Sequence, residues 1–488
     1  MGDYCPCILL YMEVSMDKFR GVKFESTKGN KYLYDNNSGM VFNLDECEFK
    51  EKSDFENYTN KLGQVESPQV KNIKAKDVEN FLVDDGNGFK QLVIELTTQC
   101  NLRCKYCCYS EHYEYSRGYS NNNITFETTK KAVDIYLENF KKVYYRNPLR
   151  SPVIGFYGGE PLLNFKVIKE TIDYIKEKYS ELTPYYNITT NAILLNDKIS
   201  DFLVENNFSI LVSLDGDKEA HDRNRVKEDG SGSYDLVMKN LNALRKRYPD
   251  YLKISISACY DPKTDLIKVG NFFDNQKLFV TKMAQVDGSS KTYYKQFTQD
   301  DFSNYKNKLD FLRDEFLKKA LANKLEKNSF LYSIIGIGYL EFSYHPMLTD
   351  KRTWLIPYTG CCVPGEKIYV TVDGKFHICE KINPNYSIGD IDRSIDYEKI
   401  ASLINEYNAV MCDDCVDCNI TRLCNYCFMK CANSEGFAMD KRNCTAMENR
   451  VKEILREYVD ILEEKPEILE KITVDYYDSI IKRVGEGC

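Results

Sequence analysis

Between residues 90 and 290, short apolar segments alternate with segments in which apolar residues recur every three or four positions. Leu92, Ile94 and Leu96 have the period of two that is typical of a strand, whereas Ile168, Ile172, Ile175 and Tyr179 have helical spacing, as do residues 237, 241, 244 and 248. Further strands are predicted at 153–156, 186–189, 210–214, 252–257 and 278–280. Repeated strand–helix alternation favours a parallel sheet. About six such units indicate an open or partial barrel with its active-site loops at the carboxyl ends of the strands.

The segments on either side of this region have different patterns. Near the N-terminus, 31–35 and 39–44 flank the turn residues Asp35-Asn-Asn-Ser-Gly39, which predicts a hairpin. Charged helical stretches follow, and 84–88 is interpreted as a linker. Towards the C-terminus we predict a charged helix over 300–325, a hairpin of 367–372 and 375–378 around Asp373-Gly374, and a helical tail from 445 to 485.

Composition narrows the class of protein. A chain of 488 residues, 43% hydrophobic and 29% charged, predicts two to four soluble globular domains and excludes collagen-like and disordered classes. The net charge of -8 argues against nucleic acid as a partner. Near the N-terminus, the longest apolar run (8–12) is too short for a secretory signal or a membrane span. We therefore expect a cytoplasmic protein without a membrane partner.

Cysteine is the unusual residue of this chain. The cytosol keeps thiols reduced, so 19 Cys favour metal or cluster ligation over disulfides. The presence of only four His argues against mixed Cys/His zinc sites. The Cys residues are also concentrated, with four in the loop 100–108 and ten between 361 and 444. This distribution predicts two metal-bearing regions.

The first region is the sequence Cys100-Asn-Leu-Arg-Cys104-Lys-Tyr-Cys107, directly after a predicted strand. Three thiolates in so tight a loop can hold three irons of a four-iron cluster and leave the fourth for a small chelating molecule. The alternative is a zinc site completed by Cys108 or His112. The spacing resembles the CX3CXΦC signature of the radical S-adenosylmethionine (SAM) superfamily, with Tyr106 at the aromatic position.

The resemblance continues after the next strands. Tyr157-Gly-Gly-Glu-Pro161 is similar to the GGEP motif of the superfamily, which implies that Gly158, Gly159 and Glu160 bind the SAM amino group. It also implies ribose and methionine contacts from Thr190, Asn191, Ser213 and Asp215, and a SAM carboxylate contact from Arg225. Each assignment has an alternative without SAM. Gly-Gly-Glu-Pro would then be an ordinary turn, Asp215 would cap a turn, and Arg225 would be a solvated surface charge.

The second Cys region resembles the SPASM extension of peptide-modifying radical SAM enzymes. The resemblance implies two auxiliary four-iron clusters, one held by Cys415, Cys418, Cys424 and Cys444, the other by Cys361 or Cys362 together with Cys379. The family pattern would place a further Cys at position 428, where this chain has Phe428. The ligand set of the cluster at Cys361 or Cys362 and Cys379 therefore stays open: its fourth ligand is missing, which leaves an iron unligated, or is Cys412, Cys427 or Cys431. Two zinc ribbons are the alternative.

Together these resemblances imply an α/β fold, a partial (β/α)6 barrel with a small N-terminal winged-helix-like α+β domain and a C-terminal Cys-rich iron–sulfur domain. The expected boundaries are a leader-recognition-like domain at 1–88, the radical SAM barrel at 89–300, a helical connector at 301–355, the SPASM domain at 356–450 and a helical tail at 451–488. The implied cofactors are three [4Fe–4S] clusters, one of which binds SAM, and SAM itself.

The implied activity is peptide maturation by a 5′-deoxyadenosyl radical. The stretch 362–381 looks most like maturases that join a peptide Cys to a neighbouring residue by a thioether. The expected partners are a precursor peptide with a leader and a one-electron reductant such as flavodoxin or ferredoxin. The alternatives are another SPASM reaction, either carbon–carbon cross-linking or formylglycine formation, and a non-catalytic zinc-ribbon scaffold.

Overall fold

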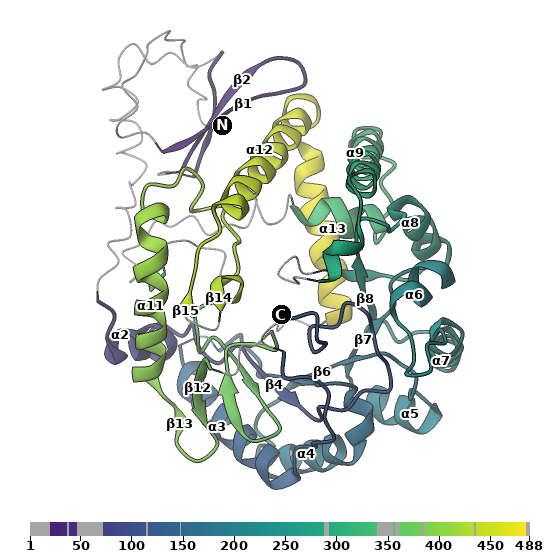
Figure 1. The fold of residues 1–488 in the computed structure, drawn as a ribbon, viewed down its shortest axis with the longest axis vertical. Coiled ribbons are helices and arrows are strands. Elements are labelled where there is room, and N and C mark those ends of the chain that lie inside the picture. Colours follow the sequence, from purple (N-terminus) through teal and green to yellow (C-terminus); the bar gives the residue numbers. More distant parts are fainter. Residues whose placement is uncertain are drawn as a thin grey trace.

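The computed structural model describes residues 20–36, 39–45, 72–113, 116–146, 148–286, 292–338, 355–356, 362–381, 385–433 and 436–484. Its centre is a run of six parallel strands that pair in chain order, and Figure 1 shows helices along the outside of this run. The strands are β4 (Gln91–Glu95), β5 (Val153–Tyr157), β6 (Tyr185–Thr190), β7 (Ser209–Ser213), β8 (Ile254–Tyr260) and β9 (Val280–Gln285). The predicted α/β alternation is confirmed, and closure into a partial barrel stays a prediction.

Helices connect these strands, as the 3.6-residue patterns predict. They are α3 (Phe126–Tyr144), α4 (Phe165–Lys178), α5 (Asp197–Glu205), α6 (Lys218–Asn224), α7 (Tyr234–Arg247) and α8 (Leu266–Asn275). Side chains that accept hydrogen bonds from the first turn begin several of them, among them Thr125 for α3, Asn196 for α5 and Asp217 for α6. Two strand predictions were misplaced: β8 begins at Ile254 rather than 252, and β9 runs from Val280 to Gln285, beyond the apolar run at 278–280.

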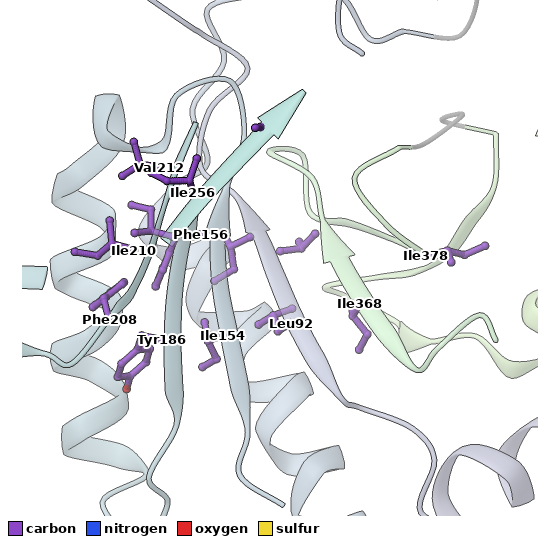
Figure 2. Close-up of a cluster of buried hydrophobic side chains, with 14 of the residues drawn as sticks. Leu92, Ile154, Phe156, Tyr186, Phe208, Ile210, Val212, Ile256, Ile368 and Ile378 are labelled. Carbon is purple, nitrogen blue, oxygen red and sulfur yellow. The ribbon is translucent and has the colours of Figure 1, made fainter. Parts of the chain in front are cut away.

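The inner strands are buried on both faces, so their apolar residues are nearly continuous. Figure 2 shows side chains from five of the parallel strands and from a later hairpin gathered in one core, including Leu92, Ile154, Phe156, Ile210 and Ile256. These residues are almost completely shielded from solvent. The core thus gives the carboxyl ends of the strands a rigid base.

The sheet does not end at β4. Strand β10 (Lys367–Val370) pairs parallel with β4, and β11 (Lys375–His377), β12 (Ser387–Asp390) and β13 (Ser394–Ile395) follow antiparallel, which makes a ten-stranded sheet. The predicted hairpin of 367–378 is confirmed. Its pairing with β4 was not predicted, and it joins the Cys-rich region to the parallel strands through shared hydrogen bonds.

The described parts of residues 1–88 contact two different places. Strands β1 (Gly21–Glu25), β2 (Lys31–Asp35) and β3 (Val41–Asn43) form an antiparallel sheet against α12 (Lys441–Glu464), at the top of Figure 1. The hairpin is confirmed, and β1 was missed. The short helix α2 (Ala75–Glu79) and the π turn η1 (Asn80–Asp84) follow, and α2 packs on α11 (Tyr397–Cys415). The winged-helix-like prediction depends on 46–71, which lie outside the described residues, and stays a prediction.

The remaining elements are mostly helical. The predicted connector helix is α9 (Gln299–Leu321), and the predicted tail is two helices, α12 and α13 (Glu467–Val484). Short elements complete the chain: the 3-10 turns η2 (Pro161–Asn164), η3 (Tyr293–Gln296) and η5 (Phe428–Cys431), the π turn η4 (Tyr332–Gly336), and the hairpin β14 (Ala432–Asn433) and β15 (Gly436–Phe437). None of the described helices is both long and apolar enough to cross a membrane.

Candidate functional site

The first Cys loop leaves the carboxyl end of β4, where the sequence placed it. The backbone N–H of Leu102 donates to Cys100 Sγ at 3.4 Å, and Asn191 Nδ2, after β6, donates to Asn101 Oδ1 at 2.7 Å. Asn191 Nδ2 also lies 3.9 Å from Cys100 Sγ. Backbone bonds from Arg103 to Val226 and from Lys105 to Asn224, at the end of α6, hold the other side of the loop.

The three thiols of this loop influence one another electrostatically. Burial, together with the charges on Glu160 and Cys107, raises the pKa of Cys100 to about 12. Burial also raises the pKa of Cys104, and both other thiols contribute to the increase. In contrast, a hydrogen bond from Cys108 lowers the pKa of Cys107 to about 6, so Cys107 is the natural thiolate of the set. A bound iron cluster would compensate the negative charges that Cys100 and Cys104 carry as ligands.

Among the described residues, no group of three His, Cys, Asp or Glu side chains is arranged to hold a single metal ion. The zinc alternatives stay open. Three partly buried Cys residues whose charges act on one another, with a backbone N–H donor to Cys100, fit a four-iron cluster in chemistry and in number.

The Gly-Gly-Glu-Pro turn lies against this loop. Gly158 has a φ of +136°, and a Cβ on Gly159 would lie only 1.8 Å from the carbonyl oxygen of Gln99. Backbone bonds from Gly159 to Thr97 (2.7 Å) and from Glu160 to Gln99 (2.8 Å) join the two segments. Both glycines are thus required by the approach of the turn to the Cys loop, a reason that the sequence interpretation did not include.

Glu160 is buried, and the chain itself satisfies its carboxylate. Oε1 accepts from Thr190 Oγ1 (2.7 Å) and from the N–H of Leu162 (3.1 Å), while Oε2 accepts from the N–H of Asn191 (2.8 Å). Burial raises the pKa of Glu160 to about 7 although these donors lower it. The structure therefore brings Glu160, Thr190 and Asn191 together beside Cys100. Their contacts with SAM stay a prediction.

A second carboxylate organises the opposite side. Asp215, after β7, accepts from the Tyr106 hydroxyl and from the N–H of Cys259 (2.9 Å), and it lies 3.0 Å from Nε of Arg225. Arg225 also lies over the Tyr106 ring at 5.4 Å. Both charged residues are buried, so the alternatives of a solvated Arg225 and an Asp215 that only caps a turn are wrong. Ser213 ends β7 and is partly exposed.

His221 holds this pair in place. Its Nδ1 accepts from the N–H of Asp215 at 3.4 Å, which leaves the proton on Nε2 to bond Ser233 Oγ at 2.9 Å. Ser233 in turn donates to the carbonyl of Arg225 at 2.7 Å. Burial lowers the pKa of His221 to about 4, so the ring is neutral near pH 7.

Sequence reasoning missed a buried ion pair under the Cys loop. Glu95, the last residue of β4, lies 2.5 Å from Nε of Arg117, and the Arg117 guanidinium stacks on the Tyr109 ring at 3.7 Å. The other Glu95 oxygen accepts from the N–H of Val372 in the β10–β11 turn at 3.3 Å. Tyr109 also lies 3.2 Å, hydroxyl to hydroxyl, from Tyr369 of β10. The acid within the apolar run Leu92-Val-Ile-Glu-Leu96 was the available signal.

The second Cys region divides into two groups. In the first, burial raises the pKa of Cys415, and the charges of Cys418, Cys424 and Cys444 raise it further, so these four thiols are neighbours. Cys412 lies on α11 and also acts on Cys415. In the second group, Cys362 is an exposed residue whose thiol is partly desolvated, which raises its pKa; burial brings the pKa of Cys379 to about 12, and the charge of Cys427 raises both. Cys361 lies outside the described residues.

The departure at position 428 has a packing reason. Phe428 is buried and its ring stacks on Tyr407 at 4.2 Å, so it is part of the apolar core. Cys431 is buried beside the same ring, with its Sγ 4.0 Å from the Tyr407 hydroxyl and 3.8 Å from Met411 Sδ. Cys427, rather than Cys431, therefore lies with Cys362 and Cys379. Ligation by any of these residues stays a prediction.

Comparison with known proteins agrees with this geometry. Residues 94–262 match the family model of the radical SAM superfamily. The chain is 27% identical over 352 residues to the cysteine-type anaerobic sulfatase-maturating enzyme of Clostridium novyi (69% of this chain, 87% of that protein). It is 24% identical over 348 residues to the radical SAM cyclopropyl synthase TigE of Paramaledivibacter caminithermalis (68% of this chain, 67% of that protein).

Two further matches are a relative that is similar over only a third of this chain and a solved structure with a similar fold at low identity. The uncharacterized protein MJ0907 of Methanocaldococcus jannaschii is 35% identical over 159 residues, which is 33% of this chain and 50% of that protein. The solved structure of anSMEcpe with bound AdoMet superimposes with a TM-score of 0.58 at 20% identity and covers 79% of this chain and 98% of the other. This chain is therefore an enzyme with a radical SAM domain at residues 94–262, related to anaerobic sulfatase-maturating enzymes and to the cyclopropyl synthase TigE.

Proposed function

We propose that the chain is a peptide maturase that installs thioether cross-links, from a Cys sulfur to a carbon, in a Cys-containing precursor peptide. When bound, a [4Fe–4S] cluster and SAM supply a 5′-deoxyadenosyl radical that removes hydrogen from an unactivated carbon. Cys100, Cys104 and Cys107 would hold that cluster. Two auxiliary clusters would be held by the two groups of C-terminal Cys, and a flavodoxin or ferredoxin would deliver the electron.

The chain's own residues prepare this site. Asp215 binds the side chains of Arg225 and Tyr106 beside Cys104, and the His221–Ser233 bonds link the backbones of Asp215 and Arg225. Arg225 would then meet the SAM carboxylate with an already ordered guanidinium. Glu160, held by Thr190 and Asn191, would accept from the SAM amino group. Both carboxylates are buried, so water does not compete for the contacts that they would make with SAM.

The observation that carries the thioether proposal is the location of Cys362, Cys379 and Cys427. Tyr109, two residues after Cys107, donates to the carbonyl of Glu380, the neighbour of Cys379, at 3.4 Å. Cys362 is exposed. An auxiliary cluster there with an unligated iron would bind a substrate thiolate within a short distance of the radical site. Because this chain is related to sulfatase-maturating enzymes, formylglycine formation is the second candidate.

Mass spectrometry of the product separates these reactions. The reconstituted protein is incubated anaerobically with SAM, reductant and a Cys-containing precursor peptide, and the product is then alkylated. A thioether removes two hydrogens, one as an atom and one as a proton and an electron, and it also removes one alkylatable thiol. Loss of two hydrogens with every thiol still alkylated indicates a carbon–carbon bond or a ring. Formylglycine replaces the Cys sulfur by oxygen with the loss of two hydrogens. Either of these last outcomes refutes the thioether proposal.

Residues 1–88 are proposed to recognise the leader by adding it as a strand to a sheet edge. The edge strands β1 and β3 of the N-terminal sheet support this proposal. We expect a chain without 1–88 to modify leader-bearing peptide poorly. Because the described part of 1–88 also contacts the Cys415–Cys424 segment, the truncated protein must first be shown to retain its iron.

A further inference from the structure

We propose that Tyr34, on the N-terminal sheet, donates a hydrogen bond to the sulfur of the auxiliary cluster held by Cys418 and thereby raises the reduction potential of that cluster. This inference rests on the proposed function, in which the thiols of Cys415, Cys418, Cys424 and Cys444 hold the cluster. It assigns to the N-terminal sheet an electronic role in addition to any binding of a leader.

The first observation is the direction in which the side chains of β2 point. Tyr32, Tyr34 and Asn36 point to one face of the sheet because alternate residues of a strand share a face. At one end of this row, the Tyr32 hydroxyl donates to Glu463 of α12 at 2.8 Å. At the other end, Asn36 Nδ2 lies 3.4 Å from the carbonyl oxygen of Cys418, to which it donates. Tyr34 lies between them and faces the same wall of the molecule.

The second observation is that the Tyr34 hydroxyl is buried without a hydrogen-bond partner in the described part of the chain. Its side chain is completely buried, and within the described residues the hydroxyl has no hydrogen-bond partner. A buried hydroxyl without a partner destabilises a protein, so its retention inside an apolar cluster calls for an acceptor. The apolar cluster around Tyr34 includes Val22, Ile420 and Leu455, and Cys418 packs against it.

The packing identifies that acceptor. Cys418 lies against the apolar cluster that contains Tyr34, and Asn36, two residues further along the chain, donates to the carbonyl of Cys418. Burial raises the pKa of Tyr34, the Arg422 guanidinium lowers it, and the charges of Asp35 and Cys418 raise it, which agrees with this packing. A cluster sulfur at Cys418 would accept the hydrogen bond that the described chain leaves unmade. Hydrogen bonds to cluster sulfurs stabilise the more negative, reduced state and so raise the potential.

The segment that carries Cys418 is also fixed against β2. Arg422 Nε donates to the carbonyl of Asn36 at 2.6 Å, and the N–H of Arg422 donates to Asn36 Oδ1 at 3.1 Å. These bonds hold the Cys loop at one distance from the sheet. Tyr34 therefore faces the sulfur from a rigid support, which is what a positioned donor requires.

The test compares Tyr34→Phe with Tyr32→Phe in the full-length, reconstituted protein. Each variant removes one hydroxyl from the same face of the same strand. A redox titration followed by electron paramagnetic resonance measures the auxiliary cluster. In Tyr34→Phe we expect the ratio of reduced to oxidised cluster at a fixed potential to fall about tenfold, which equals 59 mV for one electron. Tyr32→Phe should leave the ratio unchanged.

Two further measurements keep the proposal falsifiable. Without clusters, Tyr34→Phe should unfold at the same temperature as the wild type or above it, because an unpaired buried hydroxyl has been removed. A fluorinated tyrosine at position 34 keeps the shape and is a stronger donor, so it should raise the potential. A full iron content with an unchanged potential in both variants overturns this inference alone. A wild-type protein that binds iron only at Cys100, Cys104 and Cys107 overturns the ligand assignment and this inference with it.

Discussion

The buried pair of Glu95 and Arg117 offers a quantitative test of how the Cys loop is held. Replacing Arg117 by Met keeps an apolar chain over the Tyr109 ring but leaves the Glu95 carboxylate without its cation. Removing one partner of a buried ion pair costs about 3–5 kcal/mol. Protonation of the remaining carboxyl limits that cost. At pH 7.5, neutralising a carboxyl with an ordinary pKa of 4.5 takes about 4 kcal/mol, at about 1.4 kcal/mol per pH unit.

The pH dependence has a definite sign. The unpaired Glu95 has a folded-state pKa raised above its unfolded value, so the variant loses stability as the pH rises and recovers it as the pH falls. Burial already raises the pKa of Glu95 in the wild type, so relative to wild type at the same pH we expect a loss of at most about 4 kcal/mol at pH 7.5 and at most about 1.4 kcal/mol at pH 5.5. The double variant Glu95→Gln/Arg117→Met should recover most of this, because no buried charge remains.

Hydrogen exchange measured by mass spectrometry on peptides from 97–120 and 367–378 checks these values. A local loss of 4 kcal/mol corresponds to exchange about a thousandfold faster. Lys131→Met, which breaks an exposed pair with Asp392, is the matched control and should have almost no effect. Equal destabilisation at both pH values, or a double variant as unstable as the single one, would falsify the reasoning.

Three other expectations follow from the site. Gly159→Ala should abolish iron binding at the first Cys loop, because its Cβ would overlap the Gln99 carbonyl. Gly118→Ala, whose Cβ meets open space, should retain iron and lose only about 1–2 kcal/mol of stability. Iron analysis and thermal unfolding measure these outcomes. Cys427→Ala should lower the iron content by about one cluster and Cys431→Ala should not, and equal iron in both would contradict the grouping. The pKa of His221 is lowered to about 4 in the folded protein, so the stability that it contributes is present above pH 6.5 and lost as the pH falls towards 4. Replacement of His221 by Gln should therefore weaken the dependence of unfolding free energy on pH between 4 and 6.5.

The sequence alone determined the features that depend on local pattern. The alternation of apolar segments set the order and type of the elements from 91 to 285, because each strand and helix must bury one set of side chains at its own period. The spacing of Cys100, Cys104 and Cys107 after β4 also indicated the first cluster site. These residues are four and three positions apart, so they lie in one loop and their closeness is a local property of the sequence.

Only the tertiary structure decided what lies between distant segments. Strand β10 pairs with β4 although the paired residues are 276 positions apart in the chain, and this pairing places Tyr369 against Tyr109 and Val372 against Glu95. The grouping of Cys427 with Cys362 and Cys379 follows from the burial of Phe428 in the apolar core. Such contacts depend on the packing of complementary surfaces, and a spacing pattern contains no information about a partner far along the chain. The pairing of Tyr34 with the Cys418 loop belongs to the same class, since the two residues meet only when the N-terminal sheet packs on α12.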